Sequence, residues 1–340
     1  MSVSRAVLIT GCSTGIGRAT AQRLCQAGLP VYATARKPET LAALADKGIR
    51  VLHLDVTDED SMVHAVKQIT EDHGAVGTLV NNAGSGVYGS VEDVPLETAR
   101  ASFETNVFGA IRLTQLVVPG MRAQGHGRIV NVSSVLGRFS PPGGGLYQAT
   151  KHAIEAYSDA LRLEVAPFGI RVCVIEPAVV RTDFFATAMN QFAGSPGPAY
   201  ADFYTDLANW AIDVAQGHRA AGRFAASPER IAEVIESAST ATRPRARYQV
   251  GALARSSLFM RRYLPDTLFD RFLRSQFPAP RTARSRRLLR RRENLPKFFL
   301  APSQGRRSLP PVSGPSPTTP VAAAEACARA QRQAHSARPP

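Results

Sequence analysis

A tyrosine and a lysine, Tyr147 and Lys151, are four positions apart in a segment with a helical pattern. Residues four apart on a helix lie on the same face, one turn from each other. A phenol with a pKa near ~10 is a poor acid or base at neutral pH, but an ammonium one turn away favours the phenolate and lowers that pKa. Ser134, thirteen positions upstream at the end of a strand-like run, is placed to hold a substrate oxygen against the phenol. These three residues predict proton transfer in the reduction of a carbonyl or the oxidation of an alcohol.

Short apolar runs alternate with helical patterns through the first 180 residues and position these side chains. The expected strands are residues 6–10, 30–34, 50–54, 78–81, 128–133, 171–176 and 245–251. The expected helices are residues 15–27, 39–45, 58–72, 96–121, 146–167, 252–263 and 266–277, with one more that begins after Ser227. Most strands are continuous apolar runs, as in a parallel sheet that is covered on both faces. The chain is therefore predicted to be an α/β protein, with a Rossmann-type, doubly wound parallel sheet of about seven strands flanked by helices.

The composition changes near residue 280. Residues 281–340 contain 13 Lys and Arg but 2 Asp and Glu, whereas residues 1–280 contain 28 and 25, so most of the net charge of +14 belongs to the last segment. The nearly neutral body gives no reason to expect nucleic-acid binding. Residues 302–340 are rich in Pro, Ala, Ser and Arg, and such a segment buries too little apolar area to fold. We expect one domain over residues 1–280, with a substrate loop at 183–226 and C-terminal helices at 252–277, and a disordered basic tail over 281–340.

The four cysteines form no C-x-x-C and no metal-ligand spacing, so neither a metal site nor a disulfide framework is predicted. The first residues lack a secretory signal pattern, and no apolar run is long enough to span a bilayer. A reduced, cytoplasmic location is the expectation. Arginines interleaved with Leu and Phe over residues 255–277 leave two interpretations open: helices that cover the substrate mouth, or peripheral contact with an anionic membrane.

A glycine-rich turn, Thr10-Gly11-Cys12-Ser13-Thr14-Gly15-Ile16-Gly17, joins the first strand to the first helix. Gly11 allows a sharp exit from the strand, Gly15 lets the backbone approach a pyrophosphate, and Gly17 lets the helix pack close to the sheet. The N-terminus of the helix then presents free N–H groups to the phosphates. The alternative is a tight turn with no ligand. We predict a dinucleotide site that contains Thr10, Gly11, Ser13, Thr14, Gly15, Ile16 and Gly17.

The end of the second strand distinguishes between the two nicotinamide dinucleotides. NAD sites usually place Asp or Glu about 20 residues after the glycines, where it accepts from the ribose hydroxyls. This chain has Arg36 and Lys37 there, and no carboxylate before Glu39. An arginine suits a 2′-phosphate. The sequence therefore predicts NADP(H), against the alternative that both cations only solvate a loop.

These motifs together resemble the short-chain dehydrogenase/reductase family of the Tyr-x-x-x-Lys type, over roughly residues 4–251. Besides the glycine turn, the resemblance rests on Asp55-Val56, Asn81-Asn82-Ala83-Gly84, Asn106, Ser134, Tyr147, Lys151 and residues 177–182. Residues 31–36 and 10–13 also resemble the 17β-hydroxysteroid and retinol dehydrogenase branch. One departure is Ala178, where the family usually has glycine after the proline. Alanine costs little there unless the position needs a positive φ.

The resemblance implies a role for each motif in holding the cofactor. Asp55 would accept a hydrogen bond from the adenine amino group, with Val56 beside it. Asn82, Ala83 and Gly84 would lie along the adenosine ribose. Lys151 would bond the nicotinamide ribose, and the loop after the sixth strand would meet the nicotinamide through Pro177, Val180 and Thr182.

The resemblance also implies the chemistry. NADPH would deliver hydride to a carbonyl carbon, while Tyr147 protonates the oxygen and Ser134 donates a hydrogen bond to it. Asn106 would hold a water that links Lys151 to solvent.

The substrate is harder to infer. The region near the cleft would include Val87, Tyr88, Leu136, Phe139, Leu146, Phe184 and Phe185. Among these, Leu136, Phe184 and Phe185 are the substrate-binding candidates, together with Ser134 and Tyr147. Their apolar character fits a lipophilic alcohol or ketone, of steroid, retinoid, fatty or polyketide type.

Two further interpretations stay open at the level of sequence. The first is a regulator that senses NADP without turnover, although the chain keeps both the tyrosine and the lysine. The second is a protein that also binds membranes through its basic C-terminus. Homodimers or homotetramers are what the family implies.

Overall fold

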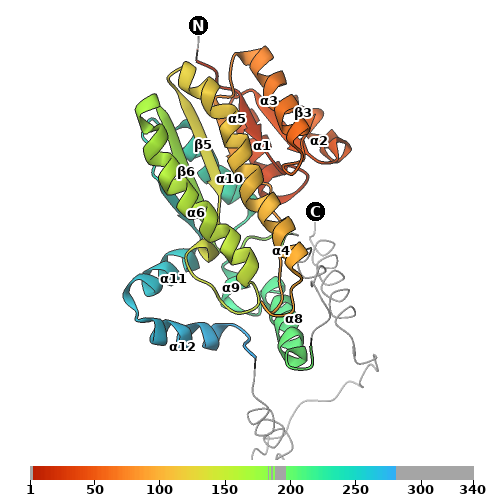
Figure 1. The fold of residues 1–340 in the computed structure, drawn as a ribbon, viewed down its shortest axis with the longest axis vertical. Helices are drawn as coiled ribbons and strands as arrows, with labels where there is room; N and C mark the ends of the chain where they lie inside the picture. Colours follow the sequence, from red (N-terminus) through yellow and green to blue (C-terminus); the bar gives the residue numbers. More distant parts are fainter. Residues whose placement is uncertain (1–2, 183, 185–186, 188–196, 281–340) are drawn as a thin grey trace, which may run out of the picture.

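The computed structural model describes residues 3–182, 184, 187 and 197–280, and within them the chain forms a seven-stranded parallel sheet (Figure 1). The strands are β1 Val7–Ile9, β2 Val31–Ala35, β3 Arg50–His53, β4 Thr78–Asn81, β5 Gly127–Val132, β6 Ile170–Pro177 and β7 Arg247–Val250. Their order across the sheet is β3-β2-β1-β4-β5-β6-β7. Because the order reverses beside β1, the carboxyl ends of β1 and β4 form the switch point at which such sheets bind ligands. The predicted fold class is confirmed, while the expected tail over 281–340 lies outside the described residues.

The helices occupy the connections between the strands. They are α1 Gly15–Gln26, α2 Ala42–Ala45, α3 Glu59–His73, α4 Leu96–Phe103, α5 Gly109–Ala123, α6 Gly145–Val165, α8 Ala201–Ala215, α9 Ala220–Arg223, α10 Pro228–Thr240, α11 Ala252–Tyr263 and α12 Asp266–Gln276. Three short 3-10 turns lie in the connections: η1 Pro38–Leu41 precedes α2, η3 Val135–Gly137 follows β5, and η4 Ala166–Phe168 follows α6. None of the helices formed by described residues has the length and apolar character needed to cross a membrane.

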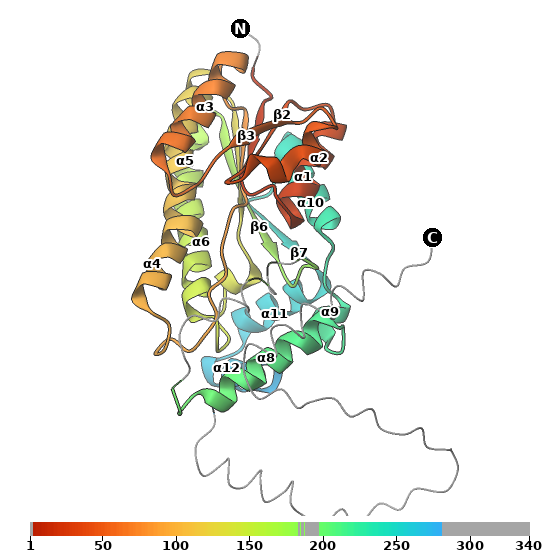
Figure 2. The ribbon, with the colours of Figure 1, turned by 90° about the vertical axis from the view of Figure 1, so that its right-hand side faces the viewer.

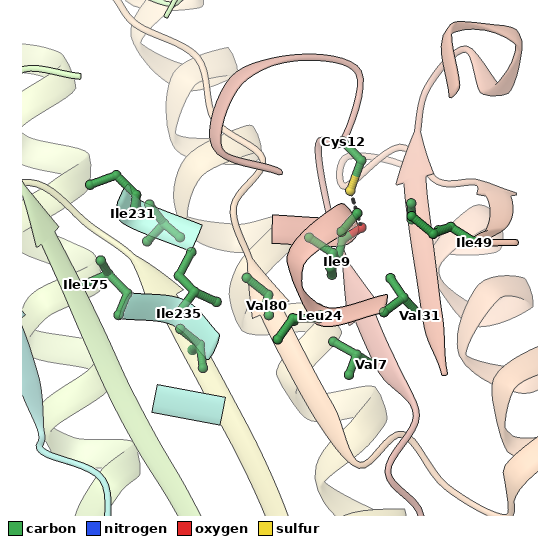
Figure 3. Close-up of a cluster of buried hydrophobic side chains, with 14 of the residues drawn as sticks. Val7, Ile9, Cys12, Leu24, Val31, Ile49, Val80, Ile175, Ile231 and Ile235 are labelled. Atoms are coloured by element: carbon green, nitrogen blue, oxygen red, sulfur yellow. Dashed lines mark hydrogen bonds between the residues drawn. The ribbon is translucent and has the colours of Figure 1, made fainter. Parts of the chain in front are cut away.

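The sheet separates two hydrophobic layers, because successive side chains of a strand point to opposite faces. Val7 and Ile9 of β1 face the layer built with α1 and α10, in which Leu24 and Ile235 are fully buried (Figure 3). Leu8 of the same strand faces the layer built with α3, α5 and α6. Figure 2 shows α1, α2 and α10 on one side of the sheet and α3, α5 and α6 on the other. Burial on both faces explains why the strands are continuous apolar runs in the sequence.

The helix expected over residues 96–121 is interrupted. A π-helical turn, η2 Glu104–Phe108, separates α4 from α5, and the backbone N–H of Gly109 bonds to the carbonyl of Glu104, five residues back. Gly109 also lies against the loop between β3 and α3, since a Cβ on it would come 2.4 Å from the carbonyl oxygen of Val56. This turn contains Asn106, whose side chain is buried. Apolar periodicity alone does not reveal such a turn, because the residues on both sides of it keep a helical pattern.

The segment expected to be a loop, residues 183–226, contains helix α8 and the single turn α9. The aromatic residues of α8 recur with helical spacing and form a separate cluster: Phe203, Tyr204, Leu207, Trp210, Ala211 and Val214. The loop interpretation was therefore wrong for residues 201–215. A parallel bridge between Val180 and Ala226 closes the base of the segment, with N–H···O bonds of 2.9 Å from Arg181 to Ala226 and from Ala226 to Val179.

Helices α8, α11 and α12 lie at the carboxyl end of the sheet, at the end of the molecule opposite the N-terminus (Figures 1 and 2). The helix pair α11–α12 packs on Val135 and Phe139, which follow β5. Trp210 of α8 donates from Nε1 to the carbonyl of Gln276, 2.9 Å away, at the end of α12. These contacts form a helical cap beside the strand ends that carry Ser134 and Pro177.

Candidate active site

The glycine turn has the tight geometry that its sequence predicts. Gly11 has a φ of +71°, a conformation that favours glycine, and a Cβ on it would lie 2.9 Å from the Cα of Ala83. A Cβ on Gly17 would lie 2.3 Å from the carbonyl oxygen of Gly11, so only glycine lets α1 approach the end of β1 this closely. The two glycines therefore fix the start of α1 against the ends of β1 and β4.

Thr10 and Asn82 tie those two strand ends together. The hydroxyl of Thr10 accepts hydrogen bonds from the backbone N–H groups of Asn82, at 3.0 Å, and Ala83, at 2.9 Å. In return, the Asn82 amide donates to the carbonyls of Thr10, at 2.9 Å, and Gly11, at 3.1 Å. Two of the predicted cofactor motifs are thus adjacent in space, and the Asn82 side chain stabilises the sheet at this point.

Among the described residues, no side chain caps the N-terminus of α1. Thr14 is the N-cap residue, but its side chain makes no capping bond, and the first turn carries no acidic residue. Gly15 follows with a φ of +55°, and a Cβ there would lie 3.1 Å from the Thr182 methyl, which places the loop after β6 beside this turn. Ser13 and Ile16 complete the turn. A helix N-terminus with unsatisfied N–H groups and a narrow glycine cradle fits a pyrophosphate.

Arg36 and Lys37 are exposed immediately after β2. Neither side chain has a carboxylate within 4.0 Å in the part of the chain that the structure describes. Asp55 and Val56 follow β3, the next strand outward, and Val56 is buried. One Asp55 oxygen already accepts from the Thr57 backbone, at 2.9 Å, and from the Thr57 hydroxyl, at 2.8 Å. The expected roles of Arg36, Lys37 and Asp55 stay predictions, and their positions at adjacent strand ends are compatible with them.

Asn106 connects the loop after β4 to α6. Its amide nitrogen donates to the Ser85 carbonyl at 2.8 Å, to the Thr150 hydroxyl at 3.0 Å and to the Ser102 hydroxyl at 3.3 Å. Its oxygen accepts from the Ser85 backbone N–H at 2.7 Å. Gly84 lies against the same oxygen, where a Cβ would come within 3.2 Å. The Asn106 side chain therefore positions the helix that carries Tyr147 and Lys151; the expected water is not tested.

Ser134 and Tyr147 lie together and are both buried. The Ser134 hydroxyl lies beside the Tyr147 phenol. It accepts from the Leu136 N–H at 3.1 Å and donates to the carbonyl of Pro177 at 3.5 Å. Ser134 is the N-cap of the short turn η3, so its side chain is held by the backbone that follows β5. The chain thus brings a phenol and a hydroxyl to one point, as the thirteen-residue spacing predicted.

Lys151 lies one helical turn after Tyr147, as expected, and is buried too. Its ammonium is 5.7 Å from the centre of the Tyr147 ring and donates to the carbonyl of Val132 at 2.9 Å. Burial lowers the pKa of Lys151 to about 8, and the charge of Glu155 opposes that shift. At neutral pH the lysine therefore keeps its proton.

The expectation that Lys151 lowers the pKa of Tyr147 does not hold in this structure. Burial raises the pKa of Tyr147, and the hydrogen bond from Ser134 only partly opposes it. The physical reason is that the whole site is desolvated, which disfavours the phenolate more than the neighbouring dipoles and charges favour it. Tyr147 is therefore a protonated phenol at neutral pH.

Aromatic rings flank Tyr147 on two elements. The ring of Tyr88, from the loop after β4, is 6.1 Å from that of Tyr147, and the ring of Phe184 is 5.7 Å from it. Leu136, on η3, is partly buried in the cluster beneath α11 and α12. Phe185 lies outside the described residues. Ala178 needs no special backbone, since among the described residues only glycines have a positive φ.

The sequence reasoning missed a buried ionic cluster behind Lys151. Glu155, one turn further along α6, and Glu176, at the end of β6, are 5% and 0% exposed. Arg138 lies 3.8 Å from the Glu155 carboxylate and 3.3 Å from that of Glu176. Arg247 lies 3.0 Å from the Glu155 carboxylate and 3.4 Å from that of Glu176. Burial and the charge of Glu155 raise the pKa of Glu176. A glutamate at the end of the apolar run over residues 172–175 was the available signal.

The comparisons with known proteins agree with this geometry. The sequence model for the family described as short chain dehydrogenase matches residues 5–192. The chain therefore belongs to the short-chain dehydrogenase family. It is an oxidoreductase that uses a nicotinamide dinucleotide and acts on CH–OH groups. The finer likeness to the 17β-hydroxysteroid and retinol dehydrogenase branch stays a prediction.

Several individual proteins are similar over most of the chain. The uncharacterized oxidoreductase YusZ of Bacillus subtilis is 33% identical over 280 residues, which cover 79% of this chain and 97% of that protein. The NADPH-dependent 3-dehydrocapnine reductase of Ornithobacterium rhinotracheale is 31% identical over 281 residues, 78% of this chain and 95% of that protein. The crystal structure of a short-chain dehydrogenase from Streptomyces avermitilis matches with a TM-score of 0.64 and 34% identity, and covers 76% of this chain and 92% of that one.

Proposed function

We propose that the protein is an NADP(H)-linked enzyme that interconverts a lipophilic secondary alcohol and its ketone, or a primary alcohol and its aldehyde. The observation that carries this proposal is the buried phenol of Tyr147. It lies beside Ser134, is flanked by the rings of Tyr88 and Phe184, and is followed one turn later by Lys151.

The preference for NADP(H) rests on the charge at the end of β2. Arg36 and Lys37 are exposed there, with no carboxylate partner in the described part of the chain, next to the expected position of an adenosine ribose. A guanidinium can bond a 2′-phosphate in a bidentate manner, and an adjacent ammonium adds to the attraction. The name of the Ornithobacterium relative, an NADPH-dependent reductase, is a second support.

The residues that would hold the dinucleotide are those of the glycine turn, the loops after β3 and β4, and the segment after β6. When bound, the cofactor supplies or accepts the hydride. Tyr147 then gives its proton to the substrate oxygen, because its raised pKa keeps it protonated at neutral pH. Ser134 donates a hydrogen bond to the same oxygen as negative charge develops on it. Lys151, one helical turn after Tyr147, would bond the nicotinamide ribose, as the family resemblance implies.

The lipophilic substrate follows from what surrounds Tyr147. Two aromatic rings pack beside it, and the nearby cap of α8, α11 and α12 contributes two clusters of apolar side chains at the same end of the sheet. An apolar environment of this kind favours a ligand that loses little by leaving water.

The assignment of Tyr147 is tested by Tyr147→Phe. We expect at least about a hundredfold loss of kcat, which is the ordinary contribution of a positioned acid, with unchanged affinity for NADPH. NADPH fluorescence titration and absorbance kinetics measure the two properties. The matched control is Tyr248→Phe on β7, whose hydroxyl accepts from the Arg245 N–H at 3.0 Å. A Tyr147→Phe enzyme within about tenfold of the parent would show that another group supplies the proton.

The cofactor preference is tested by Arg36→Ala. Loss of a charge-assisted bond of about 1.5–3 kcal/mol should lower the ratio of NADPH to NADH efficiency by about 10- to 100-fold. Lys47→Ala, an exposed cation at the end of α2, should leave the ratio unchanged. An unchanged ratio in Arg36→Ala would remove the basis for the NADP(H) assignment.

The substrate class is tested by a panel of steroids, retinoids, long-chain ketones and short hydroxy acids, followed by NADPH absorbance. We expect kcat/KM to rise with the apolar area of the ketone and to be lowest for the hydroxy acids. Preference for a short, charged substrate would contradict the lipophilic assignment without affecting that of Tyr147.

A further inference from the structure

Helices α11 and α12 have one face toward the sheet and one toward solvent. On the inner side, Ala254, Phe269 and Leu273 are buried in one cluster with Val135 and Phe139. This packing explains the inward apolar residues of both helices. Figures 1 and 2 place the pair at the carboxyl end of the sheet.

The outer side of α11 is not explained by this packing. Its exposed residues recur at helical spacing, and we name Arg255, Phe259, Arg262 and Tyr263 the α11 outer face. Phe259 and Tyr263 are 64% and 63% exposed, and their ring centres are 4.6 Å apart. The Arg262 guanidinium lies 5.8 Å from the centre of the Tyr263 ring. A helix face that meets only water carries polar residues, whereas this one has two large aromatic rings at its centre.

The charge around the α11 outer face is positive. Arg261 pairs with Asp266 at 2.6 Å, but in residues 252–277 the other arginines, Arg255, Arg262, Arg271 and Arg274, have no carboxylate within 4.0 Å among the described residues. The sequence continues after residue 280 with seven arginines and one glutamate over residues 281–293. Unpaired guanidinium groups beside exposed rings are complementary to a surface that is both anionic and apolar.

We propose that the α11 outer face docks on an anionic lipid bilayer. Phe259 and Tyr263 enter the headgroup region, where amphipathic and aromatic side chains are favoured, and Arg255 and Arg262 bond lipid phosphates. A nucleic acid would also attract the arginines, but base stacking needs an open ring face. Here the two rings lie against each other, and Arg262 covers Tyr263.

Docking in this orientation turns the carboxyl end of the sheet toward the bilayer. The inner faces of α11 and α12 pack on Val135 and Phe139, the residues that directly follow Ser134 and η3. A membrane-dissolved compound would then meet the protein at the helices that border its catalytic end. The docking itself rests on the outer face and not on the identity of the substrate.

The experiment uses the full-length protein and flotation with phosphatidylcholine vesicles, either pure or with about 30% phosphatidylglycerol. We expect binding to the anionic vesicles at low salt, release at about 0.5 M NaCl, and little binding to the neutral ones. The double variant Phe259→Ser/Tyr263→Ser and the double variant Arg255→Gln/Arg262→Gln should each lower the partition coefficient at least about tenfold.

Matched controls lie on distant helices. Leu163→Ser changes a leucine on α6 that is 68% exposed, and Lys67→Gln removes a cation on α3 whose side chain is 71% exposed. Both should bind like the parent. Melting temperature and turnover of a water-soluble ketone should be unchanged in the outer-face variants, which separates loss of docking from loss of folding and from failure of the proposed chemistry.

Three results would overturn the proposal. One is that the parent binds neutral and anionic vesicles equally weakly. Another is that the outer-face variants keep full binding, while removal of residues 281–340 abolishes it, because the tail alone would then be the docking element. The third is that the variants change the molar mass in light scattering and not the partition coefficient, because the face would then join copies of the chain.

Discussion

Arg247 should contribute more to the stability of the fold than any exposed ion pair. It lies on β7, with its side chain 24% exposed, and it contacts three carboxylates: Glu155 at 3.0 Å, Asp159 at 2.6 Å and Glu176 at 3.4 Å. Arg247→Met keeps most of the aliphatic stem and removes the charge. The two buried glutamates then depend on Arg138 alone, whose side chain is 43% exposed.

The expected magnitude follows from this geometry. Removing one partner of a buried ion pair costs about 3–5 kcal/mol, because it leaves an uncompensated buried charge. Since Arg138 remains, we expect the lower end, about 3 kcal/mol. At about 2.1 cal/mol/K of unfolding entropy per residue, each kcal/mol shifts the melting temperature of a domain of about 280 residues by roughly 2 °C, so the fall should be about 5 °C.

The assay is thermal unfolding followed by circular dichroism at pH 7.5. The matched control is Arg112→Met, which breaks the exposed Arg112–Glu59 pair, with side chains 40% and 51% exposed. Such pairs contribute at most about 1 kcal/mol. The penalty of Arg247→Met should also shrink toward pH 5, because the pKa of Glu176 is raised and its protonation removes the unpaired charge. Equal losses in the two variants would refute the reasoning.

Three further predictions concern the site. Gly17→Ala should lower dinucleotide affinity at least about tenfold in fluorescence titration, because its Cβ would meet the Gly11 carbonyl at 2.3 Å; Gly120→Ala, with its nearest contact at 3.2 Å, should not, and equal affinities would contradict the tight turn. Lys151→Met should remove part of the pH dependence of the free energy of unfolding. In the parent the pKa of Lys151 is lowered to about 8, so between pH 8 and about 10.4 the unfolded chain binds more protons than the folded one. The free energy of unfolding of the parent should therefore rise by at most about 3 kcal/mol over this range. Melting curves of parent and variant that stay parallel over this range would count against that shift. Asn106→Ala should lower the free energy of unfolding by about 1–3 kcal/mol, because the half-buried Ser85 backbone groups and the buried Thr150 hydroxyl lose the bonds that Asn106 makes to them, and a denaturant midpoint equal to that of the parent would contradict this.

The sheet and the glycine turn were predictable because their signals are local. Most strands are buried apolar runs, and the glycines of the turn are required by a positive φ at Gly11 and Gly15 and by the close approach of Gly17 to Gly11. The spacing of Ser134, Tyr147 and Lys151 also sufficed to place them together, since a strand end and one helix turn fix their relative positions. The roles of Arg36 and Asp55 toward a cofactor stay predictions.

The parts that were not predictable depend on distant elements. The aromatic residues of α8 have helical spacing, but the same residues also suit a substrate loop, and only their packing with Phe277 and Tyr88 distinguishes the two. The prediction that Lys151 lowers the pKa of Tyr147 was wrong, because burial of the phenol by several elements has a larger effect on this pKa than the ammonium one turn away. The ionic cluster joins α6, β6 and β7, which no local pattern connects.

The bridge between Val180 and Ala226 has a consequence for how this enzyme can diversify. It joins the two ends of the segment that contains α8, so the two chain ends leave the sheet side by side whatever the length of the segment between them. A closed stem makes a change in the length of this segment cost the sheet little, because closure entropy grows slowly with length. Segments from related enzymes could therefore be exchanged between residues 181 and 225 as cassettes. New substrate ranges would then arise by replacing this one segment while the proton donor and the glycine turn stay unchanged.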